Sequence, residues 1–156
     1  MKIGLKIFAV AVAALLAVGC GDKNKGGEDE SNYDGWMLTQ WKGGDALTGT
    51  VYLQLGEDGS FTLYQSFKTF GYEKYTGTYT ISTVPDTEPI LSGTYADGTP
   101  LDSSYVVEKM TKRELRLRAL KNGFVSVYSG VVIPALVKDG VTGKGLRVAV
   151  TGKSFL

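Results

Sequence analysis

From Gly35 onward, apolar and polar side chains alternate with a period of two, and this pattern constrains the fold more than any other feature. Successive side chains of a strand point to opposite faces, so the pattern predicts half-buried β-strands. In TVYLQL (50–55), for example, Val51, Leu53 and Leu55 share one face. No stretch after residue 34 shows an amphipathic helix of ten residues or more. We expect a first strand at Gly35-Trp36 and further strands over 50–55, 60–67, 72–82, 104–110, 114–120, 124–133 and 145–152. The segment 90–99 is expected to hold a short strand followed by an Asp-Gly turn.

Turn signals separate these segments at intervals of about ten residues, which is typical of an antiparallel barrel or sandwich. Asp58-Gly59 and Asp97-Gly98 are suited to hairpins, because Asp-Gly readily supplies the positive φ angles of a tight turn. Gly77 and Gly93 lie inside expected strands, where a glycine relieves crowding as a strand bends. We therefore predict an all-β domain over residues 35–156, an antiparallel meander barrel of about eight strands.

The N-terminus has the pattern of a secretory signal peptide over residues 1–19. Lys2 and Lys6 precede an uninterrupted apolar run from Ile7 to Val18. The run is shorter than the roughly 20 residues that cross a bilayer, and it fits the apolar region of a signal peptide. The alternative is a core helix, but no polar stripe gives such a helix a face for water.

Ala17-Val18-Gly19-Cys20 resembles the lipobox of bacterial lipoproteins, with alanine where that family usually has leucine. The resemblance implies cleavage between Gly19 and Cys20, followed by acylation of the Cys20 thiol and amine. Several acyl chains hold a protein stably on a membrane, whereas one chain binds only marginally. Cys20 is the only cysteine, so no intramolecular disulfide can form. The alternative is a free or buried thiol.

Residues 20–34 are expected to form a flexible linker after the lipidated cysteine, because their polar, glycine-bearing composition cannot build a core. The acidic cluster at 28–30 has two interpretations. It resembles the export signals of surface lipoproteins of the Bacteroidota, and it also suits a solvated linker. We expect an outer-membrane lipoprotein of a Gram-negative cell envelope, facing the periplasm or the cell surface.

A second resemblance covers residues 35–120. Gly35-Trp36 is followed by the hairpin VYLQLGEDGSFTLYQ and by YTGTYTIS, LSGTYADG, YVVEKM and LRLRA. This order is similar to the lipocalin-like lipoproteins of the Bacteroidota. It departs from true lipocalins, which have Gly-x-Trp at the first strand. The resemblance implies a meander barrel, and residues 134–156 lie beyond it.

The residue inventory excludes most catalytic chemistry. The chain has no histidine, which rules out Ser-His-Asp and Cys-His catalysis and imidazole metal sites. Asp97 and Asp102 flank a turn and are either a carboxylate pair or ordinary turn residues. With 17 basic and 16 acidic side chains, the chain lacks the basic footprint of a nucleic-acid binder. We expect a non-enzymatic protein without metal or cofactor.

Two groups of side chains are candidates for binding. The chain is rich in aromatic residues, which either stack on an apolar or glycan-like ligand or fill the core. A cluster of basic residues is either an anion-binding or partner-docking strip or the solvated face of a strand. Two functions stay open: a binder of a small ligand, and a structural or protein-interaction module with a filled barrel. The aromatic candidates are Trp36, Tyr52, Tyr64, Tyr79 and Tyr95, and the basic cluster is Lys112, Arg113, Arg116, Arg118 and Lys121.

Overall fold

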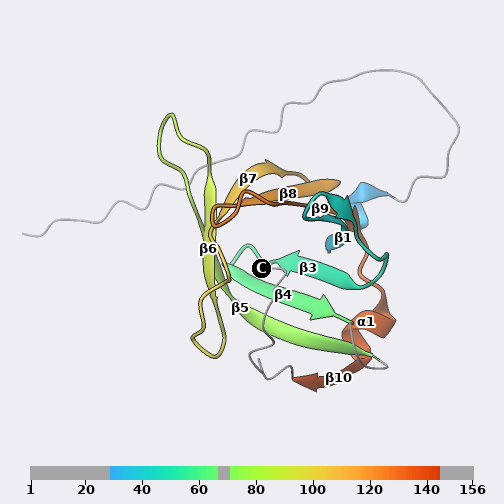
Figure 1. Cartoon of the computed structure of the whole chain (residues 1–156). Coiled ribbons are helices and arrows are strands. Elements are labelled where there is room, and N and C mark those ends of the chain that lie inside the picture. Colours follow the sequence, from blue (N-terminus) through green and yellow to red (C-terminus); the bar gives the residue numbers. More distant parts are fainter. Residues whose placement is uncertain (1–28, 67–70, 145–156) are drawn as a thin grey trace, which may run out of the picture.

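The computed structural model describes residues 29–66 and 71–144, and its main feature is a closed antiparallel barrel of eight strands (Figure 1). Each strand pairs with the next along the chain, and β9 pairs back with β1 to close the barrel. The predicted all-β antiparallel barrel is thereby confirmed. The barrel strands are β1 (Gly35–Trp41), β3 (Val51–Leu55), β4 (Ser60–Gln65), β5 (Tyr72–Ser82), β6 (Ile90–Tyr95), β7 (Tyr105–Met110), β8 (Glu114–Ala119) and β9 (Val125–Val131).

Four short elements decorate the barrel: η1 (Glu30–Asn32), β2 (Gly44–Asp45), α1 (Ala135–Asp139) and β10 (Val141–Lys144). The long strand β5 pairs with β6 over residues 77–82, and β10 runs parallel to β5 along residues 72–74. Among the described residues, no helix has the length and apolarity needed to cross a membrane. The predicted signal peptide, Cys20 and the strand expected over 145–152 lie outside the described residues.

The alternating pattern places one face of each strand inside the barrel. Val51 and Leu53 of β3 pack beside Phe61 and Leu63 of β4. Opposite them, Tyr128 of β9 is fully buried in the same core. Because inward side chains alternate with outward ones, a slip of one residue would turn the core side chains of a strand outward. The remaining buried members of this core are Leu38, Leu91, Tyr95, Leu101, Tyr105, Leu115, Leu117 and Ala119.

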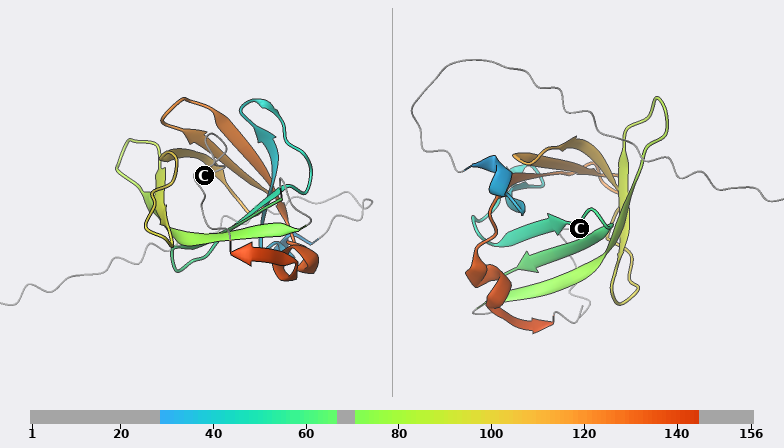
Figure 2. Two further views of the ribbon diagram at one scale, coloured as in Figure 1. Left: turned by 60° about the horizontal axis from the view of Figure 1, so that its bottom comes forward. Right: turned by 180° about the vertical axis from the view of Figure 1, so that it is seen from behind.

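A second, smaller apolar cluster lies on the outer face of β3 and β4. Tyr52 and Tyr64 are register partners whose side chains point away from the barrel interior. Ile133 and Val137 cover them, so α1 acts as a strap across this face. Figure 2 shows α1 and β10, in red, along the same side of the barrel as β5. The strap explains why large apolar residues occupy outward positions on these two strands.

Glycine is required where strands approach too closely for a side chain. A Cβ on Gly77 would lie 2.2 Å from the carbonyl oxygen of Thr94 and 2.5 Å from the Phe61 ring. The crowding predicted at this glycine is confirmed. The two predicted Asp-Gly turns are also present, with φ angles of 79° at Gly59 and 86° at Gly98.

The two ends of the barrel differ. Strands β1, β4 and β8 run in the same direction. The end of the barrel where they finish is called the loop end. The end where they begin is called the N-terminal end. Residues 29–34, expected to belong to the linker, lie against the N-terminal end. There Glu30 forms an ion pair with Arg113, and Lys112 donates to the carbonyl of Ser31 at 3.2 Å.

Candidate functional site

Two polar side chains occupy inward positions at the loop end, where β4 finishes and β5 begins. Gln65 shares a face with Phe61 and Leu63, and Glu73 shares a face with Tyr75. Gln65 and Glu73 are also register partners across the two strands. Both are half-buried, so this part of the inner face is polar and still in contact with solvent.

The hydroxyl of Tyr75 joins this polar pair to the barrel core. It donates a hydrogen bond of 2.8 Å to Oε2 of Glu73. Burial raises the pKa of Tyr75, the hydrogen bond to Glu73 raises it further, and the Gln65 side chain opposes the rise. The phenol therefore keeps its proton at neutral pH and acts as a donor to the carboxylate.

Aromatic rings continue from this polar group along the inner face. The rings of Tyr75 and Tyr95 meet edge to face, with centroids 6.3 Å apart and planes at 72°. Tyr95 meets Phe61 in the same way at 5.4 Å and 78°. Edge-to-face pairs are a favoured geometry, so the three rings form a stable aromatic wall.

The middle of the barrel is filled by side chains. Leu38, Val51, Leu53, Leu115 and Tyr128 each have 0% of their surface exposed. Complete burial also raises the pKa of Tyr128.

The rim of the loop end exposes apolar side chains beside a lysine. The Lys42 ammonium lies 4.3 Å from the centroid of the Trp41 ring and 5.6 Å from that of Phe124, which is 46% exposed. Leu47 and Leu120, in the loops before β3 and after β8, are 77% and 51% exposed. These five residues form what we call the apolar rim.

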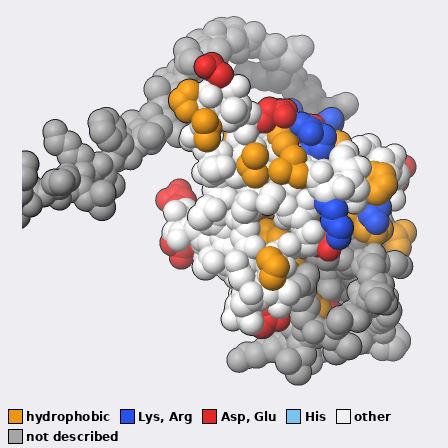
Figure 3. Space-filling view, turned by 60° about the vertical axis from the view of Figure 1, so that its left-hand side comes forward, with side chains coloured by type: hydrophobic (Ala, Val, Ile, Leu, Met, Phe, Trp, Pro, Cys, Tyr) orange, Lys and Arg blue, Asp and Glu red, His pale blue; other side chains and the backbone are white. Residues whose placement is uncertain are grey.

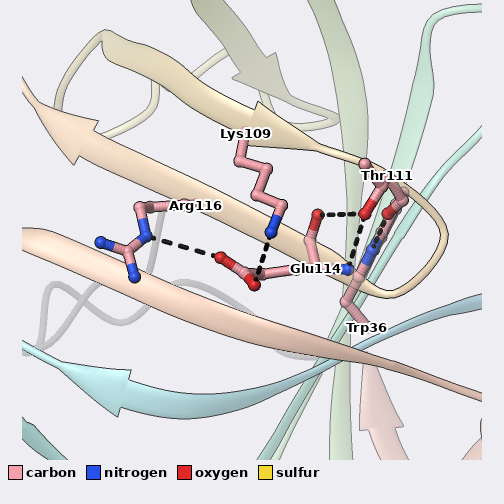
Figure 4. A network of polar contacts seen from close by, with 5 residues as sticks. All are labelled: Trp36, Lys109, Thr111, Glu114 and Arg116. Atoms are coloured by element: carbon pink, nitrogen blue, oxygen red, sulfur yellow. Dashed lines mark hydrogen bonds and ion pairs between the residues drawn. The ribbon is translucent and has the colours of Figure 1, made fainter.

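Three of the five aromatic candidates belong to the inner core. Tyr95 is buried, and Trp36 and Tyr79 pack against the same cluster. The Trp36 indole donates to the carbonyl of Thr111 at 2.9 Å (Figure 4). The Tyr79 hydroxyl donates to the carbonyl of Gly56 at 2.9 Å. Trp36 and Tyr79 thus use their polar atoms within the barrel wall.

The other two candidates, Tyr52 and Tyr64, lie in the outer cluster beneath α1. Burial raises the pKa of both hydroxyls. Tyr52 also meets Tyr72 edge to face at 6.0 Å. The structure therefore divides the five candidates between opposite faces of the wall and does not bring them into one site. The alternating pattern explains this, because Tyr52 lies between two inward-facing residues.

Arg116 and Arg118 lie on the outer face of the barrel, and both have acidic partners. Arg118 contacts Glu108 at 2.7 Å and Glu88 at 2.8 Å. Arg116 contacts Glu114 at 3.6 Å, and Lys109 shares that carboxylate, as Figure 4 shows. The space-filling view of the side that carries β6 likewise shows acidic side chains beside basic ones (Figure 3).

The rest of the basic cluster is also engaged. Lys121 pairs with Asp102 at 3.3 Å, and Arg113 and Lys112 hold η1 as described above. Carboxylates offset most of the positive charge, which favours a solvated, ion-paired face over an anion-binding strip. Asp102 thus has a lysine partner, and Asp97 accepts a 2.8 Å hydrogen bond from the Thr99 amide, as turn residues do.

Gln65 and Glu73 were not among the sequence-based candidates. Their signal was present, because the period-two register places Gln65 on the face of Phe61 and Leu63 and Glu73 on that of Tyr75. Among residues 29–66 and 71–144, no three histidine, cysteine or acidic side chains are grouped to hold a metal ion.

Comparison with known proteins identifies no family for this chain. No protein-family model, no curated protein and no solved structure matches this chain.

Proposed function

We propose that this protein is a lipocalin-like lipoprotein of a Gram-negative cell envelope that binds a small apolar or glycan-like ligand at the loop end. The observation that carries the proposal is the composition of that end. An aromatic wall continues into a small set of polar groups, formed by Gln65, Glu73 and Tyr75. Sites for small ligands combine a mostly apolar lining with a few placed polar groups.

The proposed anchor and the fold agree on an orientation. Cys20 would attach the chain to lipid nine residues before Asp29, and residues 29–34 lie against the N-terminal end. The seven residues of β1 then carry the chain toward the loop end, a rise of about 20 Å along the strand. The loop end would thus face away from the attachment point, where a ligand can enter.

A second function is favoured by the apolar rim. Leu47, Leu120 and Phe124 are exposed, whereas the side chains inside the barrel are buried. Exposed apolar groups at one end of a packed barrel suit a protein-interaction module that needs no small ligand. In that case the partner is another protein of the envelope.

Native mass spectrometry separates the two functions. The full chain is expressed in a Gram-negative host, purified gently and sprayed from a volatile buffer. Ligand binding predicts an adduct that is lost on denaturation and whose mass identifies its chemical class. A bare protein mass from several hosts, together with co-purification of one envelope protein, would contradict ligand binding and support the interaction module.

A further inference from the structure

Glu73 is a half-buried carboxylate on the inner face of the barrel, and its hydrogen-bond partner is a phenol. The carboxylates of Asp34, Glu88, Glu108 and Glu114 each pair with a lysine or an arginine. Glu73 forms no ion pair with the side chains of residues 29–66 and 71–140, and it accepts a hydrogen bond from the Tyr75 phenol. On the inner face of the loop end it therefore presents an anionic group that no cation of these residues offsets.

We propose that Glu73 selects a ligand that carries a cationic amine on an apolar body, a specificity that rests on the ligand-binding function proposed above. An ammonium group has donors for the free lone pairs of the carboxylate, and such charge-assisted hydrogen bonds are about twice as strong as neutral ones. The Tyr75 hydroxyl occupies one lone pair of Oε2 and holds the carboxylate in position. The other oxygen, Oε1, is left for the amine.

The neighbouring rings fit the same ligand. The Tyr75 hydroxyl is bonded to Glu73, and the Tyr95 ring meets the Tyr75 ring edge to face. Tyrosine rings attract cations placed over their faces, and they also pack against apolar chains. An anionic ligand would be repelled by Glu73. An uncharged ligand would give the Glu73 carboxylate no donor stronger than the Tyr75 phenol.

The test uses three probes with the same twelve-carbon chain and different head groups: dodecylamine, dodecanol and dodecanoate. Each is titrated by calorimetry, below its aggregation concentration, into the full chain carrying Cys20→Ala, which removes the attachment site for lipid. Glu73→Gln keeps an acceptor for Tyr75 and removes only the charge. The matched control is Glu57→Gln, an exposed residue of the turn between β3 and β4 at the other end.

We expect dodecylamine to bind on the order of tenfold more tightly than dodecanol, with dodecanoate weakest. Glu73→Gln should weaken dodecylamine binding to about the affinity of dodecanol, and Glu57→Gln should change neither affinity. Equal binding of all three probes would overturn the amine specificity and leave the ligand-binding function standing. Binding of none of them would overturn the amine specificity and, with it, an apolar ligand at the loop end. If Glu73→Gln does not fold, the order of the three affinities in the parent chain still decides whether the site prefers an amine.

Discussion

Replacing Gly77 by alanine tests whether the barrel closes as tightly as the structure indicates. The added Cβ would lie 2.2 Å from the Thr94 carbonyl oxygen, roughly 1 Å short of the closest ordinary C···O contact of about 3.3 Å. It would also lie 2.5 Å from the Phe61 ring. The Thr94 oxygen belongs to the backbone of β6, so the strand pair must separate to accommodate the methyl group.

The expected cost follows from two opposing effects. Overpacking a core costs about 1–3 kcal/mol and sometimes more. Alanine restricts the unfolded chain, which returns about 0.5–1 kcal/mol. Because the clash at Gly77 involves backbone as well as an aromatic ring, we expect a net loss of about 2 kcal/mol. For a domain of this size that lowers Tm by roughly 8 °C.

The assay is urea unfolding followed by tryptophan fluorescence, with Tm measured by circular dichroism. Thr76→Ala is the control, because Thr76 is the preceding residue on β5 and its side chain is exposed. We expect the control to cost less than about 1 kcal/mol. A Gly77→Ala protein as stable as the parent would refute the tight β5–β6 approach.

Three further results are expected. Cys20→Ala should move the protein from the membrane fraction to the soluble fraction, and a variant that stays with membranes would contradict the anchor. Burial raises the pKa of Asp34, but its hydrogen bond from Lys138 helps bring it below the ordinary value. The stability from Asp34 is therefore present above its unfolded pKa of about 3.9 and is lost as pH falls through the lower folded pKa. In Asp34→Asn the unfolding free energy should therefore fall less steeply as pH drops below about 4, and an unchanged slope would exclude this contribution. Arg116→Ser with Arg118→Ser should leave any ligand adduct intact, and loss of the adduct would restore the anion-binding hypothesis.

Sequence periodicity predicts most of the barrel because one rule acts on every strand. The predicted strand over 72–82 coincides with β5, and the two Asp-Gly turns lie where expected. The predicted segment 90–99 contains both the expected short strand and the Asp-Gly turn, and the structure places the boundary between them at Tyr95. Propensity alone cannot separate the end of a strand from the turn that follows it.

The rest depends on tertiary contacts. The strap α1 has only five residues, too few for a helical period to show in the sequence. Its position over Tyr52 and Tyr64 makes two outward aromatic residues part of a core. Because the sequence does not show the strap, these two tyrosines were predicted as ligand candidates on their aromatic character alone. Glu73 was passed over because a carboxylate on a strand normally indicates the solvent face. The period of two already places Glu73 on the face of Tyr75, and the register with Gln65 and the bond to Tyr75 show that this face is the inner one.

The most direct test of the account is to locate the bound ligand by hydrogen–deuterium exchange of the full chain carrying Cys20→Ala, with and without saturating dodecylamine. The account predicts slower exchange at the end of β4, at the start of β5 around Glu73 and in the loop after β8. Protection confined to the outer face of β7 and β8, or to the turn between β3 and β4, would contradict a ligand site at the loop end.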